Sequence, residues 1–191
     1  MRKYRKKNFD VSRIRRFLEP GPVVLISSAH KGKRNIMTCG WHMMMEYTQV
    51  GCFIWDQNHS REMIRRSKEC VINLPTADMI DAVIDIGNCH ASELGEDEDK
   101  FEKFDLTPAP ATKVQAPLIA ECYANFECDL IDTSLINKYS LFVFEVVKAH
   151  VAAAGKGAPK YPTTVHYRGD GVFMVAGRNV SYRRRFKPVN L

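Results

Sequence analysis

The stretch that decides the fold is residues 34–75, RNIMTCGWHMMMEYTQVGCFIWDQNHSREMIRRSKECVINLP. It contains three short runs rich in apolar, β-branched and aromatic side chains, at residues 35–38, 51–55 and 70–74, and Pro75 ends the last run. Such runs, bounded by turn-forming residues, predict three strands in quick succession.

A polar turn and a helix are expected between the second and third strands. Residues 56–60 predict the turn and residues 61–68 predict the helix, with Ser60 as its N-cap. The Ser60 hydroxyl and the free backbone N–H groups of a first helical turn suit an anion such as a phosphate ester, and Arg61 adds a bidentate cation. The alternative is a surface helix whose basic side chains are simply solvated, and this stretch taken alone favours that alternative.

Beyond residue 75 the sequence predicts strands more often than helices. Further strands are expected at residues 120–132, 140–150, 163–167 and 172–175, in addition to one at residues 23–28 near the start. Short helices are expected at residues 78–86, ended by Gly87, and at residues 96–104, with the proline-rich residues 106–117 as an extended connector. Many short antiparallel strands with only short inserted helices predict a mainly β fold, a closed or partly closed β-barrel.

Length and composition indicate one domain. A chain of 191 residues with 45% hydrophobic content can bury a core of its own, so we expect a single domain over residues 1–191. It contains no apolar run long enough to cross a bilayer, and its first residues lack the apolar segment of a secretory signal. We therefore expect a cytoplasmic protein that does not bind a membrane.

The net charge of +6 comes from the two ends of the chain. Residues 1–16 contain eight Lys or Arg and residues 178–191 contain five, which leaves 15 basic and 21 acidic residues between them. An acidic body without a basic stripe argues against a nucleic-acid partner. We expect the basic N-terminal segment and the basic C-terminal tail to be solvated, or to fold over a neighbouring subunit and reach its anionic ligand.

The six cysteines and six histidines do not follow a metal-binding pattern. No CxxC and no HExxH occurs, so no metal site is expected. Strand alternation places Cys122 and Cys128 inward and Tyr123, Asn125, Glu127 and Asp129 outward. Cys39 and Cys89 are set apart because both lie in polar or glycine-containing segments near suspected ligand-binding elements.

Six blocks in a fixed order carry a resemblance to a known family. They are PGPVVLISS, NIMTCGW, NHSREMIRRSKECVINLP, DKFEKFDLTP, APLIAECYANFEC and FVFEVVKAHV, spread over about residues 17–177. In this order they resemble the flavin reductase-like, flavoredoxin-type proteins. The resemblance implies an FMN-binding split β-barrel with Greek-key antiparallel strands, a homodimer, and FMN held noncovalently in a groove near the subunit interface.

The resemblance also implies which residues bind FMN. The block NIMTCGW would line the edge of the isoalloxazine ring and the block NHSR would take the phosphate, so the first set is Asn35, Met37, Thr38, Cys39, Gly40, Trp41, Asn58, His59, Ser60 and Arg61. Gly40 lets a backbone approach a flat ring, and Thr38 can hydrogen-bond a polar edge. Core packing is the alternative for Met37 and Trp41, and a solvent-exposed loop is the alternative for His59.

Two segments depart from the family pattern. Residues 88–93, NCHASE, replace the more usual Asn-Thr-Ser-Gly, where contacts from Ala91, Ser92 or Lys100 are expected. Residues 46–49, EYTQ, replace a proline-containing turn. His166 matches a family position near the active site, and an outward-facing strand histidine is its alternative.

The expected activity is electron transfer from NAD(P)H through bound FMN to flavin or another acceptor. Because the flavin supplies the hydride chemistry, no catalytic side chain is assigned. Two alternatives stay open: a flavoredoxin-type electron carrier reduced by a redox protein partner, and a non-catalytic flavin- or heme-binding module.

Overall fold

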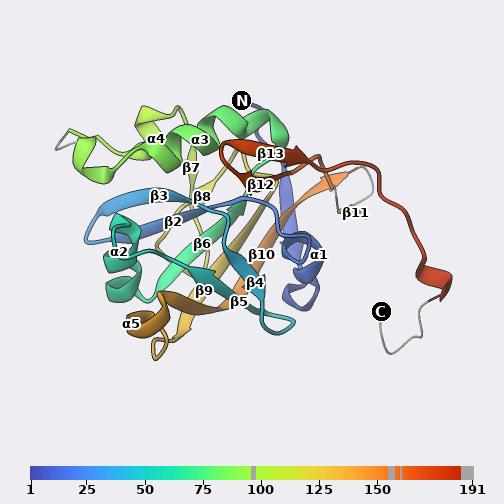
Figure 1. Ribbon diagram of the computed structural model, residues 1–191, viewed down its shortest axis with the longest axis horizontal. Helices are drawn as coiled ribbons and strands as arrows, with labels where there is room; N and C mark the ends of the chain where they lie inside the picture. The colour runs from blue at the N-terminus through green and yellow to red at the C-terminus, as the bar shows by residue number, and fades with distance from the viewer. Residues whose placement is uncertain (96–97, 155–157, 160, 186–191) are drawn as a thin grey trace.

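An antiparallel sheet of nine strands forms the centre of the structure (Figure 1). The computed structural model describes residues 1–95, 98–154, 158–159 and 161–185. Seven strands of the sheet lie in the order β3, β2, β6, β9, β10, β5, β4, and β1 and β11 also pair with β10. Their bounds are β1 Lys6–Phe9, β2 Val24–His30, β3 Lys33–Cys39, β4 His42–Met44, β5 Gln49–Phe53, β6 Glu69–Leu74, β9 Ala124–Asp132, β10 Leu141–Ala154 and β11 Ala158–Pro159.

Two small sheets and several short helices complete the described chain. The small sheets pair β7 Pro108–Ala109 with β8 Leu118–Ile119, and β12 Val165–Gly169 with β13 Val172–Val175. The α-helices are α1 Arg15–Leu18, α2 His59–Ser67, α3 Ile80–Asn88, α4 Lys100–Lys103 and α5 Ile136–Tyr139. The 3₁₀ turns are Val11–Arg13, Ala77–Met79, Ala91–Glu93 and Arg183–Arg185.

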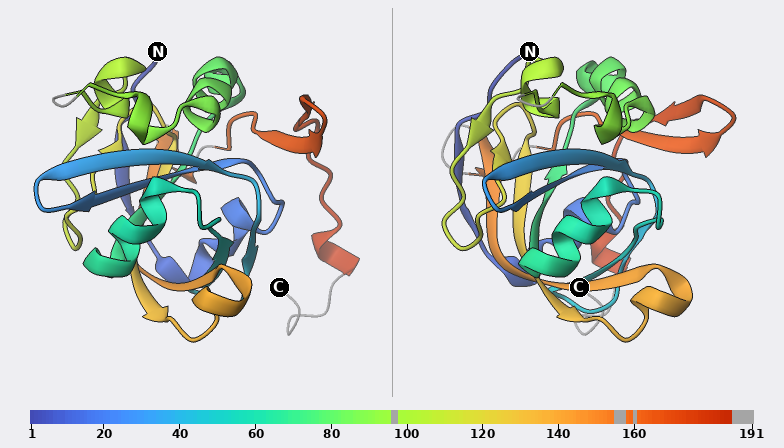
Figure 2. Two further views of the ribbon diagram at one scale, coloured as in Figure 1. Left: turned by 60° about the vertical axis from the view of Figure 1, so that its left-hand side comes forward. Right: turned by 90° about the vertical axis from the view of Figure 1, so that its left-hand side faces the viewer.

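The large sheet is rolled into a partly closed barrel. Its path begins at β3 and ends at β4, yet only Gly40 and Trp41 separate these two strands in the chain. The two ends of the sheet therefore meet at one corner, as the curled ribbons in Figure 2 show. This mainly β, antiparallel split barrel confirms the fold class predicted from the sequence. The hairpin β12–β13 forms a sheet of its own, although the sequence placed these residues in the barrel wall.

Both faces of β2 and β3 are buried, which explains their continuous apolar runs. Val24 and Ile26 belong to the core inside the barrel, which also contains Phe126, Phe142 and Phe144. Leu25 and Ile36 belong to a second core beneath α3 and α4, together with Val83, Ile86 and Phe101. Helix α3 thus packs on the outside of the barrel, directly over β3.

Helix α2 begins two residues earlier than the sequence predicted. Asn58 has an extended backbone and is the N-cap, so the prediction that Ser60 is the N-cap is wrong. Ser60 is fully buried as the second residue of the helix, because it faces Ser28 and Asn35 on β2 and β3. The helix ends at Ser67, and the C-cap Lys68 has a left-handed backbone (φ 63°) and donates its N–H to Ile64 O.

The predicted exposed face of β9 is largely buried. Tyr123, Asn125 and Glu127 were expected to point outward, yet all three are buried, and only Asp129 is exposed. The connector that contains β7 covers Glu127, which accepts a hydrogen bond from Thr112 N (3.0 Å). Asn125 Nδ2 donates to Ile119 O in β8 (3.0 Å), and Tyr123 packs in the core inside the barrel. Cys122 and Cys128 are buried as predicted, but Cys122 packs in the outer core and Cys128 inside the barrel.

The two basic ends of the chain are placed differently in the structure. In the N-terminal segment, β1 pairs with β10, and Lys6 Nζ donates to Ile119 O (3.0 Å) and Ala120 O (3.3 Å). Burial lowers the pKa of Lys6 to about 8, opposed by the nearby Cys122 and Glu121. The expectation of a solvated N-terminal segment is therefore wrong for Lys6, whereas Lys7 and Asn8 of β1 are exposed. The described part of the C-terminal tail extends away from the barrel (Figure 1).

No helix in the described part of the chain combines the length and apolar character that spanning a membrane requires.

Candidate functional site

A polar cavity of about 430 Å³ lies between the start of α2 and the end of α3. Its lining includes ten of the sequence-predicted residues: Asn35, Met37, Thr38, Asn58, His59, Ser60, Arg61, Ala91, Ser92 and Lys100. Residues from β3, α2, α3 and α4 thus meet here although they are up to 65 positions apart in the chain. A volume of this size is typical of small-molecule sites.

A hydrogen-bonded pair forms the floor of the polar cavity beside β3. Asn35 Nδ2 donates to Ser60 Oγ over 2.9 Å, and both side chains are buried. Ser28 Oγ lies 3.4 Å from the same hydroxyl oxygen. Because Ser60 Oγ accepts these bonds, its own O–H is left to donate to an acceptor in the cavity. The N-cap Asn58 makes no side-chain capping bond, so the backbone N–H groups of His59 and Ser60, two residues that line the cavity, are not capped by it.

Arg61 does not present its guanidinium group to the polar cavity. Its Nη1 donates to Ile54 O and Ser140 Oγ, each over 3.0 Å, and Nη2 donates to Ile136 O over 3.1 Å. The group also lies over the Phe142 ring, 5.7 Å from its centroid. These contacts tie α2 to α5 and β10, so the bidentate phosphate contact predicted for this side chain is not available in this structure.

Lys100 is the buried cation of the polar cavity. Its Nζ donates to Ile86 O over 3.0 Å, and its side chain is almost fully buried. Burial lowers the pKa of Lys100, opposed by the nearby Cys89 and Glu93. An ammonium group has three donors, so two remain for a ligand. A bound anion would offset the cost of desolvating this charge.

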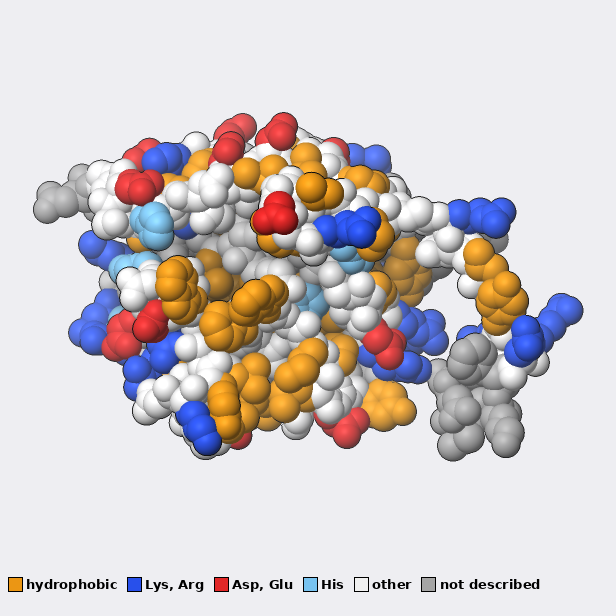
Figure 3. All heavy atoms as spheres, in the orientation of Figure 1, with side chains coloured by type: hydrophobic (Ala, Val, Ile, Leu, Met, Phe, Trp, Pro, Cys, Tyr) orange, Lys and Arg blue, Asp and Glu red, His pale blue; other side chains and the backbone are white. Residues whose placement is uncertain are grey.

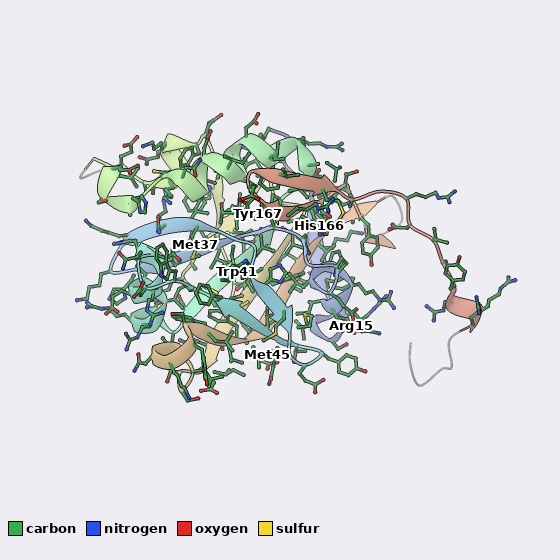
Figure 4. All side chains as sticks on the ribbon, in the orientation of Figure 1. Arg15, Met37, Trp41, Met45, His166 and Tyr167 are labelled. Atoms are coloured by element: carbon green, nitrogen blue, oxygen red, sulfur yellow. The ribbon has the colours of Figure 1, made fainter. Side chains whose placement is uncertain are left out.

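An aromatic cavity of about 480 Å³ adjoins the polar cavity along β3. It shares Met37, Thr38 and Asn58 with the polar cavity, and its other lining residues are Cys39, Gly40, Trp41, Phe53, Trp55 and Tyr167. In Figure 4, Met37, Trp41 and Tyr167 lie across the middle of this face. The Trp41 and Phe53 rings are tilted, with centroids 5.1 Å apart. Together the two cavities form one groove with a polar half and an aromatic half.

A close approach of α3 to β3 supports the junction between the two halves. Thr38 Oγ1 donates to Val83 O over 2.6 Å, and a Cβ on Gly87 would lie 3.4 Å from the Thr38 side chain. Gly87 was predicted to stop the helix. It lies inside α3, which ends at Asn88, so its small size serves this contact instead.

His166 does not line either half of the groove. Its Nδ1 lies 3.0 Å from Gly21 O, and its Nε2 lies 3.3 Å from Thr164 Oγ1. His42 approaches the neighbouring Pro22 O at 2.6 Å. Both histidines therefore hold the turn before β2. The structure brings together thirteen of the fourteen predicted residues and leaves His166 outside.

Sequence reasoning missed several residues of the groove. In the polar cavity they are Asp56, Gln57, Glu62, Ile86, Gly87 and His90, and in the aromatic cavity they are Phe53, Trp55 and Tyr167. Cys89 and His90 lie in residues 88–93, which depart from the family pattern, and this departure could have indicated His90 as a residue of the groove. Tyr167 is next to the predicted His166, and the alternation of strand β12 could have indicated that the neighbour faces the groove.

All six cysteines are free thiols and all are buried. Cys39 and Cys89, which the sequence set apart, contribute to the walls of the aromatic and polar cavities respectively. Cys89 Sγ lies 3.6 Å from His90 O. A hydrogen bond with Cys52 lowers the pKa of Cys39, opposed by burial. Among the described residues, no three His, Cys, Asp or Glu side chains are grouped to hold a metal ion.

Comparison with known proteins identifies the family. The model of the flavin reductase-like domain matches residues 15–172. The chain belongs to this family. An uncharacterized protein of Archaeoglobus fulgidus is 30% identical over 146 residues, which cover 75% of this chain and 80% of the relative.

Solved structures of flavin reductase-like proteins share the fold. The FMN-binding domain of a flavin reductase-like enzyme from Shewanella baltica superposes with a TM-score of 0.85 at 21% identity, covering 95% of this chain and 99% of that one. The flavoredoxin of Desulfovibrio vulgaris superposes with a TM-score of 0.74 at 20% identity, covering 85% and 90%. These similarities show that the chain has the split-barrel fold of these proteins.

Proposed function

We propose that this flavin reductase-like protein binds FMN in the groove and transfers electrons from NAD(P)H through it to free flavin or another acceptor. The observation that carries the proposal is the division of one groove into a polar and an aromatic half. FMN has the matching division, a dianionic phosphate on a flexible chain and a flat ring system. When bound, it supplies the exchange of a hydride for single electrons.

The polar half is assigned to the phosphate. Lys100 supplies a buried positive charge, Ser60 supplies a hydroxyl donor, and the start of α2 supplies backbone N–H groups with the positive end of the helix dipole. His59 and Ser92 line the same cavity. Arg61 is assigned a supporting role, because its guanidinium group holds α2 in place.

The aromatic half is assigned to the ring. Met37 and Trp41 supply apolar contacts, and the chain from Thr38 to Gly40 supplies backbone donors and acceptors along the ring edge. Gly40 has open space where a Cβ would lie, so its backbone is accessible to a flat ligand. Backbone donors near the ring stabilise negative charge that develops on reduction.

A spectral experiment tests this proposal. The protein is purified, mixed with FMN, freed of excess ligand and examined under anaerobic conditions. We expect an oxidised-flavin spectrum that NADH or NADPH bleaches. A protein that stays colourless after exposure to FMN would overturn the proposal.

A flavoredoxin-type electron carrier is the second candidate. It is favoured by the exposure of the aromatic cavity, where Trp41 is 70% and Trp55 57% exposed, because such a mouth can admit a protein partner. The structural similarity to flavoredoxins agrees with this candidate. In the same experiment, bleaching by dithionite but not by either nicotinamide would favour the carrier.

A further inference from the structure

A further cavity, here called the hairpin cavity, lies between α3 and the β12–β13 hairpin. Its volume is about 400 Å³. The lining residues are Val23, Thr38, Gly40, Val83, Ile84, Gly87, Asn88, Tyr167, Gly171 and Phe173. In Figures 1 and 2 the hairpin lies beside α3 and above β3.

The chemistry of the hairpin cavity differs from that of the polar cavity. None of its lining residues is charged, whereas Lys100, Asp56 and Glu62 line the polar cavity. Val23, Val83, Ile84 and Phe173 supply apolar walls, and Thr38, Asn88 and Tyr167 supply polar side-chain atoms. Moving a charged group into such a site without a partner is unfavourable. The cavity therefore suits a neutral ligand, not a phosphate or a carboxylate.

The position of the hairpin cavity relates it to the proposed ring site. It shares Thr38, Gly40 and Tyr167 with the aromatic cavity, so a ligand in one touches the same residues as a ligand in the other. Two ligands that share lining residues lie close together, which suits hydride transfer between them, because the reacting atoms must then come within about 3–3.5 Å.

Tyr167 supplies a hydrogen-bond donor to the hairpin cavity. Its Oη accepts a hydrogen bond from Gly171 N over 3.2 Å, which leaves the phenol hydrogen to donate. Its ring packs against Phe173, with centroids 5.1 Å apart. A carbonyl oxygen is the natural acceptor for such a donor, and a flat ring fits beside the two aromatic side chains.

We propose that the hairpin cavity binds a neutral, planar carbonyl compound of the quinone class as the electron acceptor. This proposal rests on the proposed function, since the electrons come from the reduced flavin. In the step, the flavin gives up two electrons and a proton and is reoxidised. The quinone takes these together with one proton from water and leaves as the hydroquinone.

A variant that fills the cavity tests the proposal. Ile84 lies on α3 and is 38% exposed, so Ile84→Trp can enter the cavity without rebuilding the core. Asn88→Trp fills the rim from a second position and serves if the first variant does not fold. Val172→Trp is the matched control, because Val172 lies on the same hairpin, is exposed and does not line the cavity.

The measurement is stopped-flow reoxidation of the FMN-loaded protein by 2-methyl-1,4-naphthoquinone. The flavin is first reduced with dithionite, so the result does not depend on the nicotinamide donor. We expect the quinone concentration for half-maximal rate to rise at least about tenfold in Ile84→Trp or Asn88→Trp, because apolar burial is lost, and to stay unchanged in Val172→Trp. FMN affinity is expected to be unchanged in all three.

One result would overturn the acceptor site alone, and a different result would overturn the proposed function. If the filled variants bind FMN and react with the quinone as the original protein does, the hairpin cavity is not the acceptor site, while the proposed function stands. If the original protein does not retain FMN, the proposed function fails, and with it the electron donor on which this inference rests.

Discussion

In the proposed site, the buried side chain of Lys100 would set both the affinity for FMN and the pH dependence of that affinity. Its ammonium group lines the polar cavity, and burial lowers its pKa. A site that binds a phosphate through this group needs it protonated. FMN affinity should therefore be full below the lowered pKa of Lys100 and fall as the pH rises through it.

We predict that Lys100→Gln weakens FMN binding by about 1.5–3 kcal/mol, the range for a hydrogen bond to a charged group. The variant should also lose the decline of affinity at alkaline pH. Fluorescence titration with FMN over a pH series measures both effects. Lys103→Gln on the same helix is the control, because Lys103 is exposed and does not line the cavity. Equal affinity in Lys100→Gln and the original protein would show that the phosphate lies elsewhere.

Arg61 has a structural role that its neighbours on α2 do not share. Its three guanidinium hydrogen bonds reach Ile54 O just after β5, Ile136 O in α5 and Ser140 Oγ just after α5. We predict that Arg61→Ala lowers the free energy of unfolding by about 2–4 kcal/mol, because buried acceptors lose their donor. Arg65→Ala, an exposed change on the same helix, should stay within about 0.5 kcal/mol. Urea denaturation measures the stability of both variants. If Arg61→Ala kept its stability but lost its affinity for FMN, Arg61 would bind the FMN phosphate and would not have the structural role assigned to it.

The errors at Ser60 and Arg61 have one physical cause. The sequence shows that a serine and an arginine open a helix, and both residue types suit an anion. It does not show that Asn35, 25 positions before Ser60, donates a hydrogen bond to the Ser60 hydroxyl. Nor does it show that Arg61 donates a hydrogen bond to Ser140, 79 positions later. Contacts between distant segments decide where these side chains point.

At the scale of elements, local periodicity predicted most strands and helices because their apolar faces meet a core. The strands at β2, β3, β5, β6, β9 and β10 and the helices α2 and α3 follow the predicted order. β1 and β4 were missed, because a four-residue basic segment and a run of three methionines do not alternate in polarity. The outer face of β9 was predicted to be exposed, because nothing local shows that the connector folds back over it.

That connector depends on Glu127. Its carboxylate accepts hydrogen bonds from the backbone N–H groups of Thr112 (3.0 Å) and Val114 (3.3 Å), and His150 Nε2 lies 2.6 Å away. Desolvation raises the pKa of Glu127, but hydrogen bonds from His150, Lys113 and Thr112 outweigh it, so the pKa lies below its usual value of 4.5. A lowered folded-state pKa stabilises the fold above pH 4.5, and this contribution is lost as the pH falls through the lowered value.

We predict that Glu127→Gln lowers the free energy of unfolding by about 1–3 kcal/mol at neutral pH. The difference from the original protein should shrink as the pH falls below 4.5. Urea denaturation at neutral and acid pH measures the change. Asp129→Asn, an exposed carboxylate on the same strand, should have little effect at either pH. A loss in Glu127→Gln that is the same at both pH values would mean that the charge of the carboxylate is not what holds the connector.

At the scale of the whole molecule, apolar side chains gather beside the groove. Figure 3 shows them on the face that carries β4 and β5, and the exposed ones include Trp41, Met43, Met45 and Trp55. A contiguous apolar surface of this kind is typical of a protein interface. We propose that a second copy of the chain covers it, which would enclose the aromatic cavity.

The resulting prediction is a homodimer that a single charge disrupts. Met43→Glu should convert the dimer to a monomer, because it places a carboxylate in an apolar contact, and it should weaken FMN binding as well. Sedimentation velocity with and without FMN measures this. Lys31→Glu, at the turn between β2 and β3, is the control and should remain dimeric. A monomer for the original protein at all concentrations would contradict the prediction.

In the proposed function, the groove along β3 holds FMN with its phosphate at α2 and its ring at Met37 and Trp41. Titration of the protein with FMN, followed by absorbance and by the fluorescence of both flavin and tryptophan, tests it most directly. We expect saturation at one FMN per chain, a shifted flavin spectrum and quenched emission from Trp41 and Trp55, the two tryptophans of the chain, with weaker quenching of the remaining Trp55 in the variant Trp41→Phe. A flavin spectrum that stays identical to that of free FMN throughout the titration would contradict it.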